Sequence, residues 1–293
     1  MPNAMPYWML SGIVLIILLG VWRHTRQKAL FPQLLIFSGQ IYFFEYVIMV
    51  LFNSYEYRPH FVSAPAYQDS VMGAVVSNLL SVPIMGAVVV IYRLRLRWIL
   101  LIALGFAIIE RIFVYLDVYE QHWWNEGYTF VSLLVFFELA KRWVDNMKKG
   151  SRLVVYVSLL TFSFSLAATM MFLLSLAGVR LFHAGVFADP YRDDVLVATA
   201  DAFAKALLMT ILLIVTEKPS WRYGSIVLLT GLQLLLLSTG TLRVYISLPL
   251  YVAIYIGCCA TVIAIASVFY KSLKRDACGW NDETRLKAVV NSR

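Results

Sequence analysis

The stretch WILLIALGFAIIERIFVY, from Trp98 to Tyr115, decides the fold class of this chain. Its only charged residues are Glu110 and Arg111, which stand side by side in an otherwise apolar run. An α-helix needs about 20 predominantly apolar residues to cross the hydrocarbon core of a bilayer. The stretch therefore predicts a transmembrane helix that must accommodate an acid and a base.

The composition of the whole chain agrees with this interpretation. Of its 293 residues, 61% are hydrophobic and 14% are charged, and the mean hydropathy is +0.75. Soluble domains usually carry about 25% charged residues. We therefore expect an all-α integral membrane protein with the lipid bilayer as its partner. The formal charge of +8 is explained by Lys and Arg in cytoplasmic loops, so we expect no nucleic-acid partner.

Apolar runs of suitable length predict about nine transmembrane helices. The predicted spans are Tyr7–Trp22, Leu30–Asn53, Val71–Tyr92, Trp98–Tyr119, Trp123–Trp143, Leu153–Gly178, Val195–Thr216, Gly224–Gly240 and Val244–Tyr270. The first and eighth spans are short, so eight or ten spans remain alternatives.

The charges between the spans predict the orientation. Bases collect after the odd-numbered spans: Arg23, Arg26, Lys28, Arg93, Arg95, Arg97, Lys141, Arg142, Lys148, Lys149, Arg152, Lys218, Arg222, Lys271, Lys274 and Arg275. The other connections are poorer in bases and carry acids. Because cytoplasmic loops are enriched in Lys and Arg, we expect the N-terminus outside and the C-terminus in the cytoplasm, in a bacterial cytoplasmic membrane.

Two segments of the chain resemble each other at a constant offset. PAYQDSVMGAVV from Pro65 aligns with DPYRDDVLVATA from Asp189, so that Tyr67 matches Tyr191 at an offset of 191 − 67 = 124. The same offset places spans two to five on spans six to nine. It predicts an anchor helix in residues 1–29, two tandem parallel four-helix units in residues 30–152 and 153–271, and a cytoplasmic tail in residues 272–293. Parallel repeats occur in transporters, with sites at the interface of the halves.

Five charged residues fall inside predicted spans and away from the span ends. A charge at the centre of a membrane helix costs roughly 2.5–3.5 kcal/mol on insertion scales, so such residues usually pair or face a cavity. We interpret them as a ligand or ion path formed by Glu45, Glu110, Arg111, Asp201 and Lys205. A set of structural pairs that hold the helices together is the alternative.

Spacing on the helices predicts how these charges are placed. Asp201 and Lys205 are four residues apart and share a helix face. Adjacent helical residues point about 100° apart, so Glu110 and Arg111 cannot share a face. We expect Glu110 to point into the bundle and Arg111 to extend outward, toward Asp117 and Glu120.

Part of the first unit resembles a family of small bacterial membrane proteins with about five helices and no established activity. The resemblance covers residues 36–143 and is carried by Pro83, by ERIFVYLD with Glu110, and by HWWNEGYTFVSLLVFF with Trp124 and Tyr128. It implies a polytopic helical fold but no chemistry.

A second resemblance concerns DAFAK, from Asp201 to Lys205, which is similar to the Asp-x-x-Ala-Lys motif of the seventh helix of microbial rhodopsins. It implies that Lys205 carries retinal as a Schiff base and that Asp201 belongs to its counterion. Ser77 and Asn78 stand where that family has an acid and a Trp, and two more spans follow the motif.

Polar residues of the loops predicted to lie outside form a further candidate site. They are Arg58, His60, Asp69, Arg180, His183, Asp193 and Asp194, which could bind a metal or an anionic head group or could simply be solvated. Neither a metal-ligand spacing nor a phosphate-binding or nucleophile motif occurs in the chain, so no cofactor is expected.

These observations favour transport or small-ligand binding at a polar site between the two units. The alternatives are an enzyme acting on lipids or lipid-linked substrates at the outer surface, a scaffold for a membrane-protein partner or a homo-oligomer, and a retinal-binding photoreceptor.

Overall fold

The fold is almost entirely helical. The structure, a computed structural model, describes residues 3–27, 29–61, 65–216 and 218–290, so Lys28 and the last three residues of the predicted tail lie outside the described residues. The helices are α1 (Ala4–Thr25), α2 (Leu30–Glu45), α3 (Ala66–Val75), α4 (Val82–Ile91), α5 (Leu96–Tyr115), α6 (Glu126–Lys148), α7 (Arg152–Leu176), α8 (Pro190–Val215), α9 (Pro219–Ser238) and α10 (Leu248–Val290).

Eight helical segments in the described ranges are long and apolar enough to cross a membrane. This is compatible with the predicted all-α, multi-pass membrane protein. Each predicted span coincides with a helix to within a few residues at its ends, except that α10 continues as helix to Val290. The predicted fifth span corresponds to α6, which carries Glu138, Lys141 and Arg142 and is not among the eight.

Two segments of π-helix interrupt the regular helices. The segment η1 (Tyr46–Leu51) continues α2, and η2 (Val76–Ser81) joins α3 to α4 just before Pro83. Pro83 has no N–H to donate to the preceding turn. In that turn Ser81 Oγ donates a 2.8 Å hydrogen bond to the Val76 carbonyl. Such π-helical turns often occur at functional sites.

Two pairs of short strands connect the loops at the helix ends. β1 (Tyr55–Tyr57) pairs antiparallel with β2 (Tyr119–Gln121), and β3 (Arg180–Phe182) pairs antiparallel with β4 (Leu242–Val244). The first pair ties the loop after η1 to the loop after α5, and the second ties the loop after α7 to the loop after α9.

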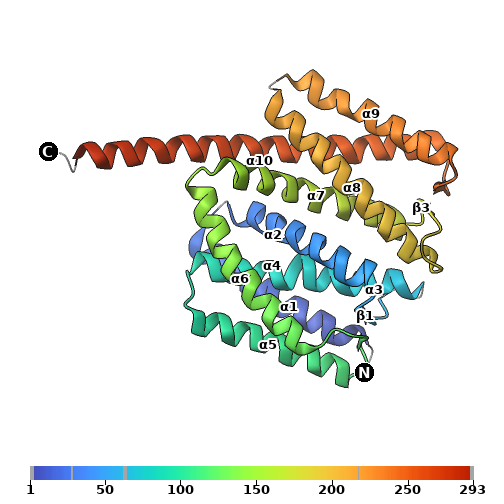
Figure 1. The fold of residues 1–293 in the computed structure, drawn as a ribbon, viewed down its shortest axis with the longest axis horizontal. Coiled ribbons are helices and arrows are strands. Elements are labelled where there is room, and N and C mark those ends of the chain that lie inside the picture. Colours follow the sequence, from blue (N-terminus) through green and yellow to red (C-terminus); the bar gives the residue numbers. More distant parts are fainter. Residues whose placement is uncertain (1–2, 28, 62–64, 217, 291–293) are drawn as a thin grey trace.

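The elements from α1 to α6 and those from α7 to α10 form two neighbouring groups, with α2 and α7 side by side at their boundary (Figure 1). Gly39 allows this close approach. A Cβ atom built there would lie 2.0 Å from the Thr161 carbonyl oxygen. Because that atom belongs to the backbone of α7, no side-chain rotation can relieve the contact.

Candidate functional site

Glu45 is the last residue of α2, directly before η1, and only 8% of it is exposed. Its Oε2 atom accepts a 2.7 Å hydrogen bond from the Tyr55 hydroxyl. Within the described part of the chain, its Oε1 atom is buried and forms no hydrogen bond of normal geometry, although the Asn78 side chain lies close enough to the carboxyl to interact with it. Glu45 is therefore held firmly at one oxygen and only weakly contacted at the other.

Glu110 lies on α5 and is half-buried. Gln121, at the end of β2, donates a 2.8 Å hydrogen bond from Nε2 to Glu110 Oε1. The adjacent Arg111 is exposed and forms a 3.3 Å ion pair with Glu126 at the start of α6. The predicted separation of the two side chains is thus seen.

Arg111 extends outward as predicted, but it does not pair with the two acids that lie in that direction. Asp117 and Glu120 form ion pairs with Arg58 instead. The reason is that β2 pairs with β1, which brings these acids to the loop that carries Arg58.

Both carboxyl groups line one large cavity of about 790 Å³. Its walls come mainly from α1, α2, η2, α5 and α6, and α7 closes one side. Thirteen of its lining residues are aromatic, and Glu45 and Glu110 are the only charged ones; the described residues contribute no Lys, Arg or His to this wall. Ligand sites are typically apolar cavities of this size with a few polar groups.

The cavity reaches the outside of the bundle beside α6. Five apolar residues line it and are also exposed, namely Phe43, Phe44, Val131, Val135 and Leu139. The cavity therefore opens at the outer surface of the helix bundle, between α2 and α6.

Three tyrosines from the strand pair close the polar end of this cavity. Tyr55, Tyr57 and Tyr119 line it, and their ring centroids are 5.0–5.6 Å apart. Burial raises the pKa of each hydroxyl well above its usual value of 10, and for Tyr55 and Tyr57 the Glu45 carboxyl raises the pKa further. These hydroxyls therefore stay protonated and act as hydrogen-bond donors at neutral pH.

A second cavity of about 100 Å³ lies at the boundary of the two groups of helices, where the sequence predicts the site. It is lined by α2, η1, α3, α7 and α8, and it shares Glu45 and Asn78 with the large cavity. Arg180 and Asp194 lie on its far side. Glu45 thus stands between the large cavity and the boundary.

Asp201 and Lys205 are not part of the large cavity. They form a buried ion pair on α8, with side chains 4% and 3% exposed. The Lys205 ammonium also lies 4.6 Å from the centroid of the Tyr255 ring, and Gln233 donates a 3.2 Å hydrogen bond to Asp201. The five charged residues that the sequence groups into one path therefore occupy separate places.

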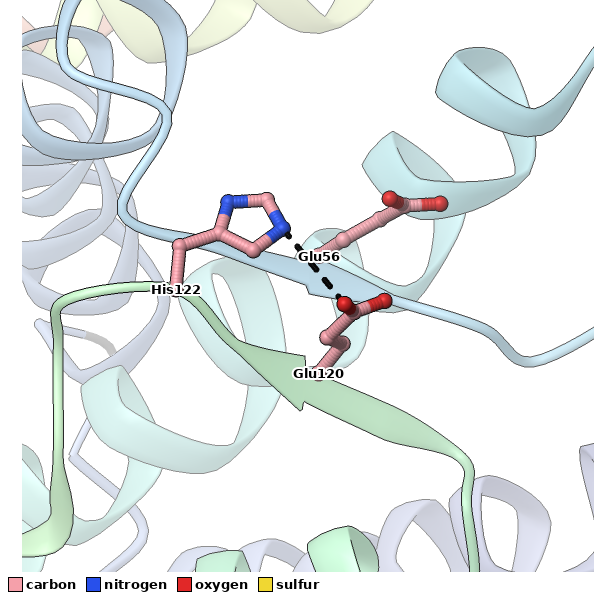
Figure 2. Close-up of side chains that lie close together, drawn as sticks. All are labelled: Glu56, Glu120 and His122. Atoms are coloured by element: carbon pink, nitrogen blue, oxygen red, sulfur yellow. Dashed lines mark ion pairs between the residues drawn. The ribbon is translucent and has the colours of Figure 1, made fainter.

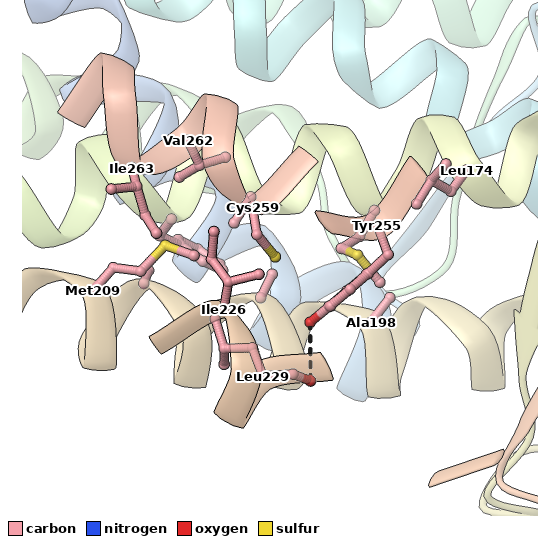
Figure 3. Packing of buried hydrophobic residues seen from close by; sticks show 14 of the residues in the cluster. Leu174, Ala198, Met209, Ile226, Leu229, Tyr255, Cys259, Val262 and Ile263 are labelled. Carbon is pink, nitrogen blue, oxygen red and sulfur yellow. Dashed lines mark hydrogen bonds between the residues drawn. The ribbon is translucent and has the colours of Figure 1, made fainter. Parts of the chain in front are cut away.

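The core of the second group surrounds this pair. Tyr255, Cys259 and Met209 belong to it, and the Tyr255 hydroxyl donates to the Leu229 carbonyl over 3.4 Å (Figure 3). Tyr251 donates a 2.9 Å hydrogen bond to Gln233. Asp201, Lys205 and these polar side chains thus form one connected buried network.

The polar residues of the outer loops divide into two groups, one on the loop before α3 and one on the loop before α8. In the first, Asp69 accepts 2.7 Å hydrogen bonds from the backbone N–H groups of His60 and Phe61. In the second, Asp193 accepts four backbone N–H groups from residues 184–187 and pairs with His183. These carboxylates hold the loops that precede their helices.

Arg180 and Asp194 form a further buried pair. Asp194 also accepts hydrogen bonds from Ser175 and from the Phe182 backbone, and Arg180 donates to the Met171 carbonyl. The pair therefore fixes β3 against α7 and α8.

The strand pair also gathers Glu56, Glu120 and His122, whose ligand atoms lie within 4.8 Å of one another (Figure 2). His122 Nδ1 lies 2.7 Å from the Asn53 carbonyl, and its Nε2 faces Glu120 at 4.0 Å. Arg58 already pairs with Glu120 and lies 3.8 Å from Glu56. The Arg58 guanidinium thus partly offsets the negative charge of the two carboxylates.

Sequence reasoning did not include the tyrosines of the strand pair, Gln121 or His122 among the site residues. One available signal was the alternation Tyr-Glu-Tyr in residues 55–57 and Tyr-Glu-Gln in residues 119–121, which is typical of strands with one buried face.

The comparisons with known proteins add no further constraint: no family model, no curated protein and no solved structure matches this chain.

Proposed function

We propose that this protein binds a small molecule with an apolar chain in the large cavity lined by Glu45 and Glu110, for transport or for ligand recognition within the membrane. The cavity is the observation that carries this proposal: it holds about 790 Å³, its walls are mostly apolar and aromatic, and two carboxyl groups line it. Glu45, whose Oε2 atom is held by Tyr55, and Glu110 would orient the polar head of the ligand.

The route of entry follows from the exposed margin of the cavity. Val131 and Val135 on α6 and Phe43 on α2 would face lipid tails in a bilayer. A ligand that dissolves in the bilayer reaches the cavity sideways, with its polar head toward the strand pair and its chain along α6.

The proposal includes the tandem organisation. The order helix, strand, helix, helix, strand, helix occurs from α2 to α6 and again from α7 to α10, when α3, η2 and α4 count as one helix. Asp69 and Asp193, at the offset 193 − 69 = 124, both accept backbone N–H groups of the preceding loop. These parallels support two related four-helix units, of which the first holds the cavity.

The proposed topology has nine crossings, with α6 as the fifth, the N-terminus outside and the C-terminus in the cytoplasm. In a labelling experiment with a membrane-impermeant thiol reagent, Asp189→Cys should react from outside and Arg95→Cys only after the membrane is opened. Reaction of both from the same side contradicts this orientation.

Ligand binding is tested with a photoactivatable dodecanol that carries a diazirine on its chain. The full-length protein in phosphatidylcholine nanodiscs should be labelled on peptides of α6 and α2 that line the cavity. Ser132→Phe, which places a ring in the cavity, should reduce this labelling, whereas Thr261→Phe on the exposed face of α10 should not. Circular dichroism verifies that both variants are folded. Labelling that is spread evenly over the lipid-facing helices and unaffected by Ser132→Phe refutes the proposal.

A further inference from the structure

We propose that the polar head taken by this cavity is a protonated amine on an apolar chain, an inference that rests on the ligand binding proposed above. The charge of the cavity is negative, because Glu45 and Glu110 are the charged groups among its described lining residues. A ligand whose head carries only negative charge, such as a fatty acid or an anionic phospholipid, would meet two acids and no cation to pair with.

The buried Glu45 carboxyl has no cationic partner in this cavity. Its Oε2 atom accepts a hydrogen bond from Tyr55, and no Lys, Arg or His among the described residues lines the cavity beside it. An ammonium group carries N–H donors and the positive charge that a buried carboxylate lacks. A neutral hydroxyl could supply the donor but would leave the charge uncompensated, and charge-assisted hydrogen bonds are the stronger kind.

The aromatic end of the cavity suits the same group. Tyr57 and Tyr119 interact electrostatically with both carboxyl groups, which places the two acids near one cluster of rings. Trp124 adds an indole ring, 6.0 Å from that of Tyr55. Aromatic faces attract cations, so carboxylates and rings together favour an ammonium over a neutral head.

In the second unit, the side-chain ammonium of Lys205 occupies the place that corresponds to this cavity. Four residues that line the cavity correspond, at the offset of 124 residues, to members of the buried network around Lys205. Position 77 corresponds to 201, 81 to 205, 109 to 233 and 131 to 255. In the cavity these positions are Ser77, Ser81, Ile109 and Val131. Small or apolar residues thus leave empty the space that Asp201, Lys205, Gln233 and Tyr255 fill in the second unit.

The partners of Lys205 show which groups this fold uses to hold an ammonium. They are a carboxylate, a tyrosine ring and, through the carboxylate, a glutamine amide. The cavity offers the same set from other helices: Glu45 and Glu110, the tyrosines of the strand pair, and Gln121, which donates to Glu110. The ligand's ammonium would take the place that Lys205 occupies in the second unit.

The test compares three photoactivatable probes with the same dodecyl chain and diazirine position: the amine, the alcohol and the carboxylic acid. At neutral pH the amine should label the cavity peptides of the full-length protein in phosphatidylcholine nanodiscs at about tenfold lower concentration than the alcohol, and the acid should label least. The double variant Glu45→Gln and Glu110→Gln should remove the preference for the amine while the alcohol still labels. Glu138→Gln, an acid outside the cavity that pairs with Lys141, is the control and should keep the preference.

The outcomes separate this inference from the proposed function. If the alcohol labels the cavity and the amine has no advantage, or if the double variant keeps the advantage, the inference is wrong and ligand binding stands. If none of the three probes labels the cavity peptides, ligand binding itself fails. Because Gln retains an acceptor for the Tyr55 hydroxyl, continued labelling by the alcohol also reports that the double variant is folded.

Discussion

Replacing Lys205 with Met should destabilise the protein by about 3–5 kcal/mol, the usual consequence of removing one partner from a buried ion pair. Asp201 and Lys205 are almost completely buried, and Lys205 also loses its contact with the ring of Tyr255. The Asp201 carboxylate would keep only the hydrogen bond from Gln233. The loss therefore comes mainly from an acid left uncompensated in the core of the second unit.

A second substitution isolates that cause. Asn at position 201 has no charge and can still accept from Gln233, so the double variant Lys205→Met and Asp201→Asn should recover most of the stability. Lys141→Met breaks the partly exposed pair with Glu138 and should change the free energy of unfolding by only about 0–1 kcal/mol.

The assay is unfolding in mixed micelles with increasing sodium dodecyl sulfate, followed by circular dichroism. The reasoning is refuted if Lys205→Met unfolds at the same detergent fraction as Lys141→Met, or if the double variant is no more stable than Lys205→Met. Either result would mean that the pair is not a charged pair excluded from water.

Three further predictions concern packing, ionisation and loop structure. Gly39→Ala should lower the free energy of unfolding by several kcal/mol, because its Cβ would lie 2.0 Å from the Thr161 carbonyl oxygen, whereas Gly12→Ala, with no atom within 4 Å, should not; equal stability in detergent titrations would contradict this. Tyr55, Tyr57 and Tyr119 should remain neutral in an ultraviolet titration of the folded protein above pH 10. Since their folded pKa values are raised above the unfolded value of about 10, their contribution to stability is complete below that pH and declines as the pH rises; replacing all three with Phe should reduce this decline. Asp193→Asn should speed hydrogen exchange of the backbone N–H groups of residues 184–187 and lower the free energy of unfolding by about 1–3 kcal/mol. The control Asp145→Asn, at a partly exposed acid, should change neither quantity.

The sequence alone was sufficient for properties that depend on a single helix. Each apolar run predicts its own helix, because the need for about 20 apolar residues is local. The divergence of Glu110 and Arg111 follows from the rotation of 100° per residue, and the pairing of Asp201 with Lys205 follows from their spacing of four. Each of these statements needs no knowledge of a neighbouring helix.

The tertiary structure alone decided which distant residues meet. Glu45 and Glu110 share a cavity because α2 and α5 are held by β1 and β2, whose pairing joins segments more than 60 residues apart. α2 is apolar on all sides, so its sequence contains no signal for the face that points inward. The sequence allowed the acids of the outer loops to bind a ligand. In the structure, however, Asp69 and Asp193 accept hydrogen bonds from backbone N–H groups of their own loops, which no sequence pattern predicted. Helix rotation and loop closure are set by packing between helices, and for that reason the site could be placed only in three dimensions.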